Sequence, residues 1–287
     1  MIATADLSYI CDVVYRTAAI VLDNGKDYLV ELRLAPLARA EGYDSIQAMV
    51  EHMREPGGVA LRAKVVEALT TNETSFFRDQ HPFDALRLHV MPQLVRARAE
   101  SRSIFVWSAA CSTGQEAYSI AMLLRDAFPD LKSWNIQIMA TDLSGAAVER
   151  TAQGRYRQIE VNRGLPVSCL VKYFEREGTE WRIRPELRAL IDARQLNLLD
   201  AWPTMPMVDV LMLRNVLIYF DVDTKRRILA RVRRVLAPDG VMFLGGAETT
   251  LNIDDHFDRA SFGNAVAYRL KNADARLTPQ QIGRSSR

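Results

Sequence analysis

The chain has 287 residues, of which 48% are hydrophobic and 25% charged, a balance typical of one large or two modest globular domains. It excludes a disordered or fibrous chain, and the net charge of +2 argues against bulk nucleic-acid binding. No run of about 18 apolar residues occurs, and residues 1–16 lack the features of a signal peptide, so we expect a cytoplasmic protein without membrane insertion. Cys11, Cys111 and Cys169 are too few and too scattered for a disulfide framework or a metal site, so we expect free thiols.

The first 70 residues or so are predicted to form a small all-helical domain. Apolar residues recur there every three or four positions, the spacing of a helix with one buried face. Proline, glycine and aspartate interrupt the pattern, and a serine stands where a helix N-cap is expected. The expected helices are 7–22, ended by Asp23-Asn24-Gly25; 28–40, interrupted at Pro36; 46–54, capped by Ser45; and 59–70, after the break at Pro56-Gly57-Gly58.

Beyond residue 100, short apolar runs alternate with helical segments. This alternation is typical of an α/β fold with a parallel, doubly wound sheet. The expected strands cover residues 104–110, 136–142, 208–215, 240–249 and 265–270. The expected helices cover residues 115–128, a segment between the cap Ser144 and the stop Gly154, and residues 224–236.

Residues 150–188 do not fit the alternation. They show little helical pattern, and Glu177-Gly178-Thr179-Glu180 is typical of a hairpin turn. Nine Lys or Arg residues against five Asp or Glu residues give this stretch a net charge of about +4. We therefore predict a small basic β insertion here, and a polar, frayed tail from Asn272 onward.

The turn after the first strand is where an open α/β sheet usually binds its ligand. Here it reads "AACSTGQE", with Gly114 as its single glycine and no glycine-lysine pair, which excludes a dinucleotide fingerprint and a P-loop. Small residues such as Ala110 still let a ligand approach the backbone. Asp142 ends the next strand, where an acid can accept hydrogen bonds from two ribose hydroxyls. These features fit a nucleoside cofactor without a pyrophosphate, and S-adenosylmethionine is the obvious one.

Two further features each have a structural and a functional explanation, and the spacing of residues does not distinguish between the two. Glu116 either binds a cofactor amino group or simply follows the preference for acids in the first turn of a helix. Arg214 and Asn215, in "LRNVLIYFD", either bridge nearby loops or line a site at the end of the fourth strand. An Asn-Pro-Pro-Tyr type sequence, as in amino-methylating DNA enzymes, is absent from this segment.

Six segments together resemble the CheR family of chemotaxis-receptor glutamate methyltransferases, in the family's order. They are "LTTNETSFFRD", "VWSAACSTGQEAYSIAMLL", "IMATDLS", "LNLLD", "LRNVLIYFD" and "VLAPDGVMFLGGAET". The resemblance implies a helical N-terminal domain at 1–75 and a Rossmann-like class I methyltransferase domain at 76–271. It also implies an antiparallel β-subdomain inserted at about 155–186, with 272–287 left as a flexible tail.

The same resemblance implies a site for S-adenosylmethionine, with S-adenosylhomocysteine as product. The "TNETSFFR" segment would border it where the helical domain folds over the sheet, with Phe76 and Phe77 packing the segment down. Arg78 and Tyr219 are the candidate catalytic residues that hold the acceptor carboxylate. The implied cofactor contacts are Asn72, Thr74, Arg78 and Ala110; Glu116 for the methionine amino group; Asp142 for the ribose; Asn197 and Leu198 for the adenine; and Arg214 and Asn215 below the sulfonium.

The implied reaction is methylation of glutamate carboxylates in the cytoplasmic domain of a membrane chemoreceptor, by a monomeric enzyme. Two departures from the family pattern bear on that partner. The short "EREGTEW" turn replaces a longer glycine-rich loop, so we expect no high-affinity tether to a receptor's C-terminal pentapeptide. Residues 1–78 carry eight basic and eleven acidic residues, so they form either a solvated surface of mixed charge or a basic receptor-facing cluster, whose candidates are Lys26, Arg33, Arg39, Arg62 and Lys64.

Two rival functions stay open at the level of sequence. One is a signalling module that keeps the cofactor pocket without transferring a methyl group. The other is a methyltransferase of the same fold that acts on RNA or a small molecule. The intact "TNETSFFR" and "RNVLIYF" segments favour an active enzyme.

Overall fold

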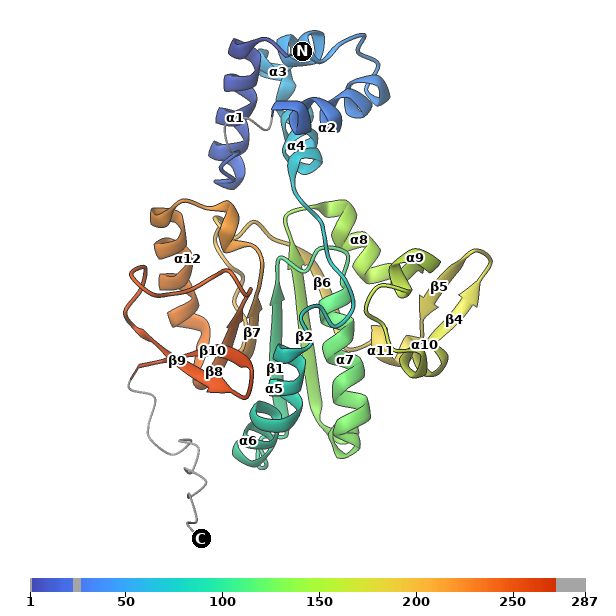
Figure 1. Ribbon diagram of the computed structural model, residues 1–287, viewed down its shortest axis with the longest axis vertical. Coiled ribbons are helices and arrows are strands. Elements are labelled where there is room, and N and C mark those ends of the chain that lie inside the picture. The colour runs from blue at the N-terminus through green and yellow to red at the C-terminus, as the bar shows by residue number, and fades with distance from the viewer. Residues whose placement is uncertain (1, 23–26, 272–287) are drawn as a thin grey trace.

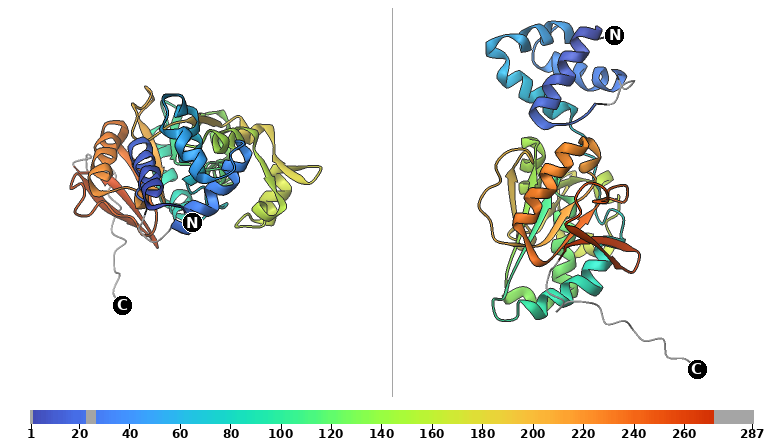
Figure 2. Two further views of the ribbon diagram at one scale, coloured as in Figure 1. Left: turned by 90° about the horizontal axis from the view of Figure 1, so that it is seen from above. Right: turned by 90° about the vertical axis from the view of Figure 1, so that its left-hand side faces the viewer.

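The computed structural model describes residues 2–22 and 27–271. Figure 1 shows a helical N-terminal domain stacked on a sheet-containing domain, with a small β-subdomain extending from one side. A single extended segment after residue 69 joins the two domains, and Figure 2 shows the same stacking from the side. The structure therefore confirms an α/β fold with a helical N-terminal domain. In the described residues no helix combines the length and the apolar character needed to cross a membrane.

The N-terminal domain is helical and has its own core. Ile10, Leu34, Met49 and Val65 are fully buried in one apolar cluster to which its α-helices contribute. The Ser45 hydroxyl accepts a hydrogen bond from the Ala48 N–H (3.1 Å), as the predicted N-cap requires. The helices are α1 (Thr4–Ala18), α2 (Asp27–Ala40), α3 (Ile46–Arg54), the 3₁₀ turn η1 (Pro56–Gly58) and α4 (Val59–Leu69).

Two helix predictions in this domain were wrong. Helix α1 ends at Ala18, four residues before the predicted end, because Ala19 adopts a left-handed conformation (φ 51°). Pro36 does not interrupt α2 but lies inside it, with Leu34 and Ala38 buried on either side. That burial offsets the loss of one helical N–H, the usual cost of an internal proline. The predicted turn at Asp23-Asn24-Gly25 lies outside the described residues.

In the described residues, seven strands form the central sheet, in the order β6-β2-β1-β7-β8-β10-β9. The strands β6, β2, β1, β7 and β8 are parallel, so their carboxyl ends meet at one edge, whereas β10 is antiparallel to β8 and to β9. The strands are β1 (Ser103–Ala109), β2 (Asn135–Asp142), β6 (Ile191–Gln195), β7 (Val208–Leu213), β8 (Leu236–Leu244), β9 (Phe257–Phe262) and β10 (Ala265–Leu270).

The sheet differs from the predicted one in two ways. It is mixed rather than wholly parallel, because the antiparallel hairpin of β9 and β10 forms one edge of it. Strands β6 and β9 were not predicted; both lie at edges of the sheet, and their exposed positions break the apolar runs that mark buried strands.

Helices cover both faces of the sheet. On one face, side chains of β1 such as Val106 pack with α5, η2, α6 and α7; on the other, Trp107 packs with α12. Ser144 caps α8 by accepting the Ala147 N–H, and Gly154 ends it with a left-handed backbone (φ 62°), both as predicted. These elements are α5 (His81–Ala85), the π-helical turn η2 (Leu86–Val90), α6 (Met91–Ala97), α7 (Gln115–Ala127), η3 (Pro129–Ser133), α8 (Gly145–Gln153) and α12 (Val222–Val235).

The β-subdomain contains the predicted hairpin, turning at Gly178 (φ 63°), in a three-stranded antiparallel sheet of order β3-β5-β4. It holds more helix than predicted, because its helices are too short to show a periodic pattern. Its charge is also largely paired: Arg155 and Arg182, for example, both contact Glu177. Its elements are β3 (Arg155–Arg157), α9 (Gln158–Val161), α10 (Val167–Tyr173), β4 (Phe174–Glu177), β5 (Glu180–Ile183) and α11 (Pro185–Arg188).

Candidate active site

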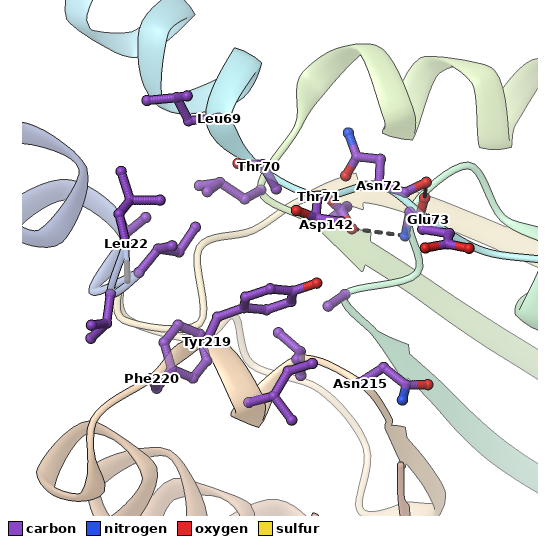
Figure 3. Close-up of a pocket in the computed structure, with 18 of the residues that line it drawn as sticks. Leu22, Leu69, Thr70, Thr71, Asn72, Glu73, Asp142, Asn215, Tyr219 and Phe220 are labelled. Carbon is purple, nitrogen blue, oxygen red and sulfur yellow. Dashed lines mark hydrogen bonds between the residues drawn. The ribbon is translucent and has the colours of Figure 1, made fainter. Parts of the chain in front are cut away.

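A cavity of about 720 Å³ lies between the helical domain and the carboxyl ends of β1, β2 and β7. Figure 3 shows residues 69–73 along one side of it, with Tyr219, Phe220 and Asn215 on another. The structure brings every predicted site residue to this one cavity: Asn72, Thr74, Arg78, Ala110, Glu116, Asp142, Asn197, Leu198, Arg214, Asn215 and Tyr219 all line it.

The turn between β1 and α7 has an unusual backbone. Ala110 (φ 56°) and Ser112 (φ 53°) are left-handed without being glycine, a conformation that costs free energy and gathers at functional sites. Gly114 (φ 89°) is required at its position, since a Cβ there would lie 2.7 Å from Thr151 Cγ2. The turn therefore presents small side chains and backbone to the cavity, as predicted from the sequence.

Asp142 is held rigidly at the end of β2. It is buried, and its two carboxylate oxygens accept hydrogen bonds from the backbone N–H groups of Ser112 (2.7 Å) and Ser144 (2.9 Å). Burial raises the pKa of this carboxyl, an effect that these hydrogen bonds oppose. A carboxylate has about four acceptor positions, so Asp142 can still accept from a ligand's hydroxyls.

Glu116 and Arg214 form an ion pair that no sequence pattern revealed. Arg214 Nη1 lies 2.9 Å from Glu116 Oε2, and Ser108 donates a hydrogen bond to the other Glu116 oxygen (2.7 Å). The second Arg214 nitrogen reaches the Asp79 carboxylate (2.7 Å) and the Arg78 carbonyl (3.0 Å). Arg214 thus bridges loops and also lines the cavity, and its role toward a cofactor stays a prediction. A role for Glu116 toward a cofactor amino group stays a prediction.

The "TNETSFFR" segment is fixed by its aromatic residues. Phe76 is fully buried and meets the Tyr156 ring edge-on, with ring centroids 5.1 Å apart. A Cβ on Gly164 would lie 2.1 Å from the Phe76 carbonyl oxygen, so the β-subdomain touches the segment directly. This packing leaves Arg78 half-buried at the cavity, where it donates a hydrogen bond to the Glu73 carbonyl (3.0 Å).

Tyr219 projects its ring into the cavity (Figure 3). Its backbone carbonyl accepts a hydrogen bond from the Val21 N–H (2.9 Å), which ties it to the helical domain. Among the described residues its hydroxyl has no hydrogen-bond partner. The side chain is thus not a core tyrosine with a satisfied hydroxyl.

Side-chain hydrogen bonds join the two domains next to the cavity. Sequence patterns missed Tyr15, Glu67 and Asp221 here, because contacts between residues so far apart in the chain leave no local signal. Asn197, predicted to contact adenine, also bonds to the helical domain. The donor-to-acceptor contacts are Tyr15 Oη to Asp221 Oδ2 (2.6 Å), Asn197 Nδ2 to Thr17 O (2.7 Å) and Ser144 Oγ to Glu67 Oε1 (2.5 Å).

The candidate basic cluster of the helical domain is largely occupied by internal contacts. Arg33 donates to the Leu69 carbonyl (2.7 Å), Arg62 donates to the Met53 carbonyl, and Lys64 pairs with Glu41. Lys26 lies outside the described residues. The helical domain therefore offers few free cations to an acidic partner in its described part.

Comparison with known proteins places both domains in one family. The family models described as "CheR methyltransferase, all-alpha domain" and "CheR methyltransferase, SAM binding domain" match residues 5–70 and 72–266. Chemotaxis protein methyltransferase 1 of Pseudomonas aeruginosa is 39% identical over 275 residues, which cover 94% of this chain and 99% of that protein. Chemotaxis protein methyltransferase Cher2 of Pseudomonas putida is 37% identical, covering 89% and 94%. The chain therefore belongs to the CheR methyltransferase family and is an enzyme that uses S-adenosylmethionine.

Proposed function

We propose that this chemotaxis protein methyltransferase transfers the methyl group of S-adenosylmethionine to glutamate carboxylates in the cytoplasmic domain of a membrane chemoreceptor. The product would be a glutamate methyl ester. The names of its relatives support the setting in chemotaxis. The composition of the cavity wall supports a carboxylate as the acceptor.

The residues present fit the cofactor. Asp142 offers free acceptor sites for ribose hydroxyls, and Glu116 keeps one lone pair on each oxygen for an ammonium group. The left-handed turn at Ala110 and Ser112 lets a ligand approach the backbone closely. Asn197 and Leu198 lie on the wall assigned to the adenine. When bound, S-adenosylmethionine supplies an electrophilic methyl group on a positively charged sulfur.

The observation that carries the proposal concerns bases that work near neutral pH, in the described part of the cavity wall. Of the described residues that line the cavity, none is histidine or lysine, the side chains most readily tuned to accept a proton near pH 7. An amine or hydroxyl acceptor must lose a proton during transfer. A glutamate, with an ordinary pKa of about 4.3, arrives as an anion and needs no base.

The enzyme's task is then orientation. Attack requires the carboxylate oxygen, the methyl carbon and the sulfur in line, with the reacting atoms about 3 to 3.5 Å apart. Arg78, through its guanidinium, and Tyr219, through its free hydroxyl, would hold the acceptor carboxylate; both line the cavity. Transfer removes two opposite charges, so the exclusion of water by the overlying helical domain favours it.

The surface of the β-subdomain supports a finer proposal about how the receptor is bound. The two-residue hairpin turn of the β-subdomain provides no long loop to grip a peptide, so we propose that no high-affinity pentapeptide tether operates. The enzyme would then act as a cytoplasmic monomer that meets the receptor through its methylation helices.

A methyl-transfer assay with tritiated S-adenosylmethionine tests the proposal. We expect incorporation into a purified receptor fragment, released as methanol by mild base, and loss of incorporation when its acceptor glutamates are changed to alanine. Free glutamate and RNA serve as parallel acceptors. Labelling of either in place of the receptor, or cofactor binding without any transfer, would contradict the proposal.

A further inference from the structure

Glu248 lies outside the cofactor cavity but binds the turn that carries three of its lining residues. Its Oε2 accepts hydrogen bonds from the N–H groups of Asn215 (2.8 Å) and Gly245 (2.6 Å). Its Oε1 accepts a hydrogen bond from the Ile218 N–H (3.1 Å). One carboxylate therefore satisfies backbone donors at both ends of the 215–218 turn, directly before Tyr219.

The turn needs such support because its backbone is strained. Asn215 has φ 58°, the left-handed region that non-glycine residues rarely adopt. An ionised acceptor on its N–H forms a strong, charge-assisted hydrogen bond that stabilises this conformation. From there the chain passes through the 3₁₀ turn η4 (Leu217–Tyr219), which sets the direction of the Tyr219 side chain.

Gly245 makes the close approach of Glu248 possible. A Cβ at Gly245 would lie 2.6 Å from Asn215 Nδ2 and 2.8 Å from both Asn215 N and Glu248 Oε2. Any other residue would push the carboxylate and the turn apart. Gly245 and Glu248 thus act on the turn as one unit.

We propose that Glu248 is a positioning residue for methyl transfer, which holds the 215–218 turn so that Asn215 and the Tyr219 hydroxyl face the cavity. The inference rests on the proposed function, in which Tyr219 orients the acceptor carboxylate. Glu248 acts through this turn and touches neither the cofactor nor the acceptor.

Graded substitution at Glu248 tests the role. At saturating cofactor and receptor, we expect Glu248→Ala to lower kcat by about tenfold or more, and Glu248→Gln, which keeps one acceptor oxygen, to lower it less. The matched control is Asp209→Asn, at the other end of β7. Asp209 also accepts a backbone N–H, that of Phe105 (2.8 Å), and pairs with Arg98 (2.7 Å), but it lies near the amino end of β7, opposite the end that borders the cavity. We expect Asp209→Asn to lower Tm and retain kcat.

A double mutant separates positioning from general stability. In a Tyr219→Phe background, Glu248→Ala should lower kcat by less than about twofold, since residues acting as a unit are not additive. Amide hydrogen exchange should accelerate at Asn215 and Ile218 in Glu248→Ala and stay unchanged there in Asp209→Asn.

Unchanged kcat in Glu248→Ala, an equal loss in Asp209→Asn, or a full additional loss in the double mutant would each overturn the inference. If the wild type labels no receptor fragment, the proposed function fails instead. The exchange rates then decide by themselves whether Glu248 holds the turn.

Discussion

The two walls of the cavity are built differently. The cofactor wall, formed by the β1–α7 turn with Asp142, Glu116 and Arg214, consists of largely buried polar groups that hydrogen-bond to one another or to backbone. The helical wall, residues 69–78 with the end of α1, presents exposed Asn72 and half-buried Arg78. It is held by contacts to separate elements, such as Arg33 of α2 to the Leu69 carbonyl and Ser112 of the β1–α7 turn to the Asn72 carbonyl. A buried, preorganised wall suits tight cofactor binding, whereas a wall held by contacts between domains suits steps that depend on closure. Substitutions on the two walls should therefore affect different constants.

The largest effect should come from the cofactor wall. We expect Asp142→Ala to weaken S-adenosylhomocysteine binding by about 1 to 3 kcal/mol, because the Ser112 and Ser144 N–H groups and the ligand's hydroxyls all lose their acceptor. Isothermal titration calorimetry measures the change. Asp223→Ala, on a side chain that is 87% exposed, is the control. Unchanged affinity in Asp142→Ala would remove this residue from the ribose role.

On the helical wall, Arg78→Ala should reduce turnover more than cofactor binding. We expect kcat to fall about tenfold, with the affinity for S-adenosylhomocysteine changed less, because a group that orients the acceptor matters mainly in the transition state. Steady-state kinetics together with calorimetry separate the two constants. Arg78→Lys keeps the positive charge but loses the planar guanidinium, so it shows how much the geometry of that group contributes to kcat. Loss of cofactor binding with turnover intact at saturation would contradict the orienting role.

A smaller effect should follow from loosening the domain boundary. Tyr15→Phe removes the hydrogen bond to Asp221 and should weaken S-adenosylhomocysteine binding by about two- to fivefold, because the closed arrangement becomes less populated. Tyr173→Phe is the matched control, since it breaks a tyrosine-aspartate bond of the same 2.6 Å length between α10 and Asp126 of α7, away from the boundary with the helical domain. Equal affinities for both variants and the wild type would show that closure does not depend on this contact.

The same contact predicts a pH dependence. The Tyr15 hydroxyl lowers the pKa of the Asp221 carboxyl below its ordinary 3.8. A depressed carboxyl pKa stabilises the folded state fully above that ordinary value, and the contribution is lost as the pH falls through the lowered pKa. In urea titrations the difference in unfolding free energy between wild type and Tyr15→Phe should therefore shrink on acidification below about pH 4. A difference that grows in acid would contradict this assignment.

The contrast between the walls also explains what the sequence could predict. The cofactor wall follows from local signals: the small residues after β1, the acid ending β2 and the cap at Ser144 each mark a position on one element. The Glu116–Arg214 pair joins residues on two elements far apart in the chain, and it leaves no such signal. The roles of the predicted site residues toward cofactor and acceptor stay predictions, although all of them line one cavity.

The errors in the fold have similar causes. Strand β9 has the sequence Phe-Asp-Arg-Ala-Ser-Phe, and only its two ends are buried. Because an edge strand exposes much of its length, its sequence does not show the alternation of apolar and polar residues that marks a strand. Helix α2 continues through Pro36 because tertiary burial outweighs a local preference. Helices α9 and α11, four residues each, are shorter than any window in which helical spacing can be detected.

The smallest expected effect concerns the β-subdomain, which belongs to neither wall. Among the strands that the structure describes, β4 pairs only with β5, so its outer edge is open to a peptide strand, the main physical argument for peptide binding. Against it, the turn at Gly178 is short, and Arg182 and Arg184 are paired with Glu177 and Glu175, leaving few free cations for a peptide carboxylate.

We therefore expect receptor-tail pentapeptides of the Asn-Trp-Glu-Thr-Phe type to give no detectable heat when titrated into the enzyme. A receptor fragment lacking its tail should be methylated as fast as the full fragment, because recognition would rest on the methylation helices. The two acceptors should be compared below saturation, where a tether would raise the effective concentration of enzyme. A scrambled pentapeptide controls for heats of dilution. Low-micromolar binding of the cognate peptide, or a clear loss of rate on removing the tail, would show that the open edge of β4 binds the receptor despite its short turn.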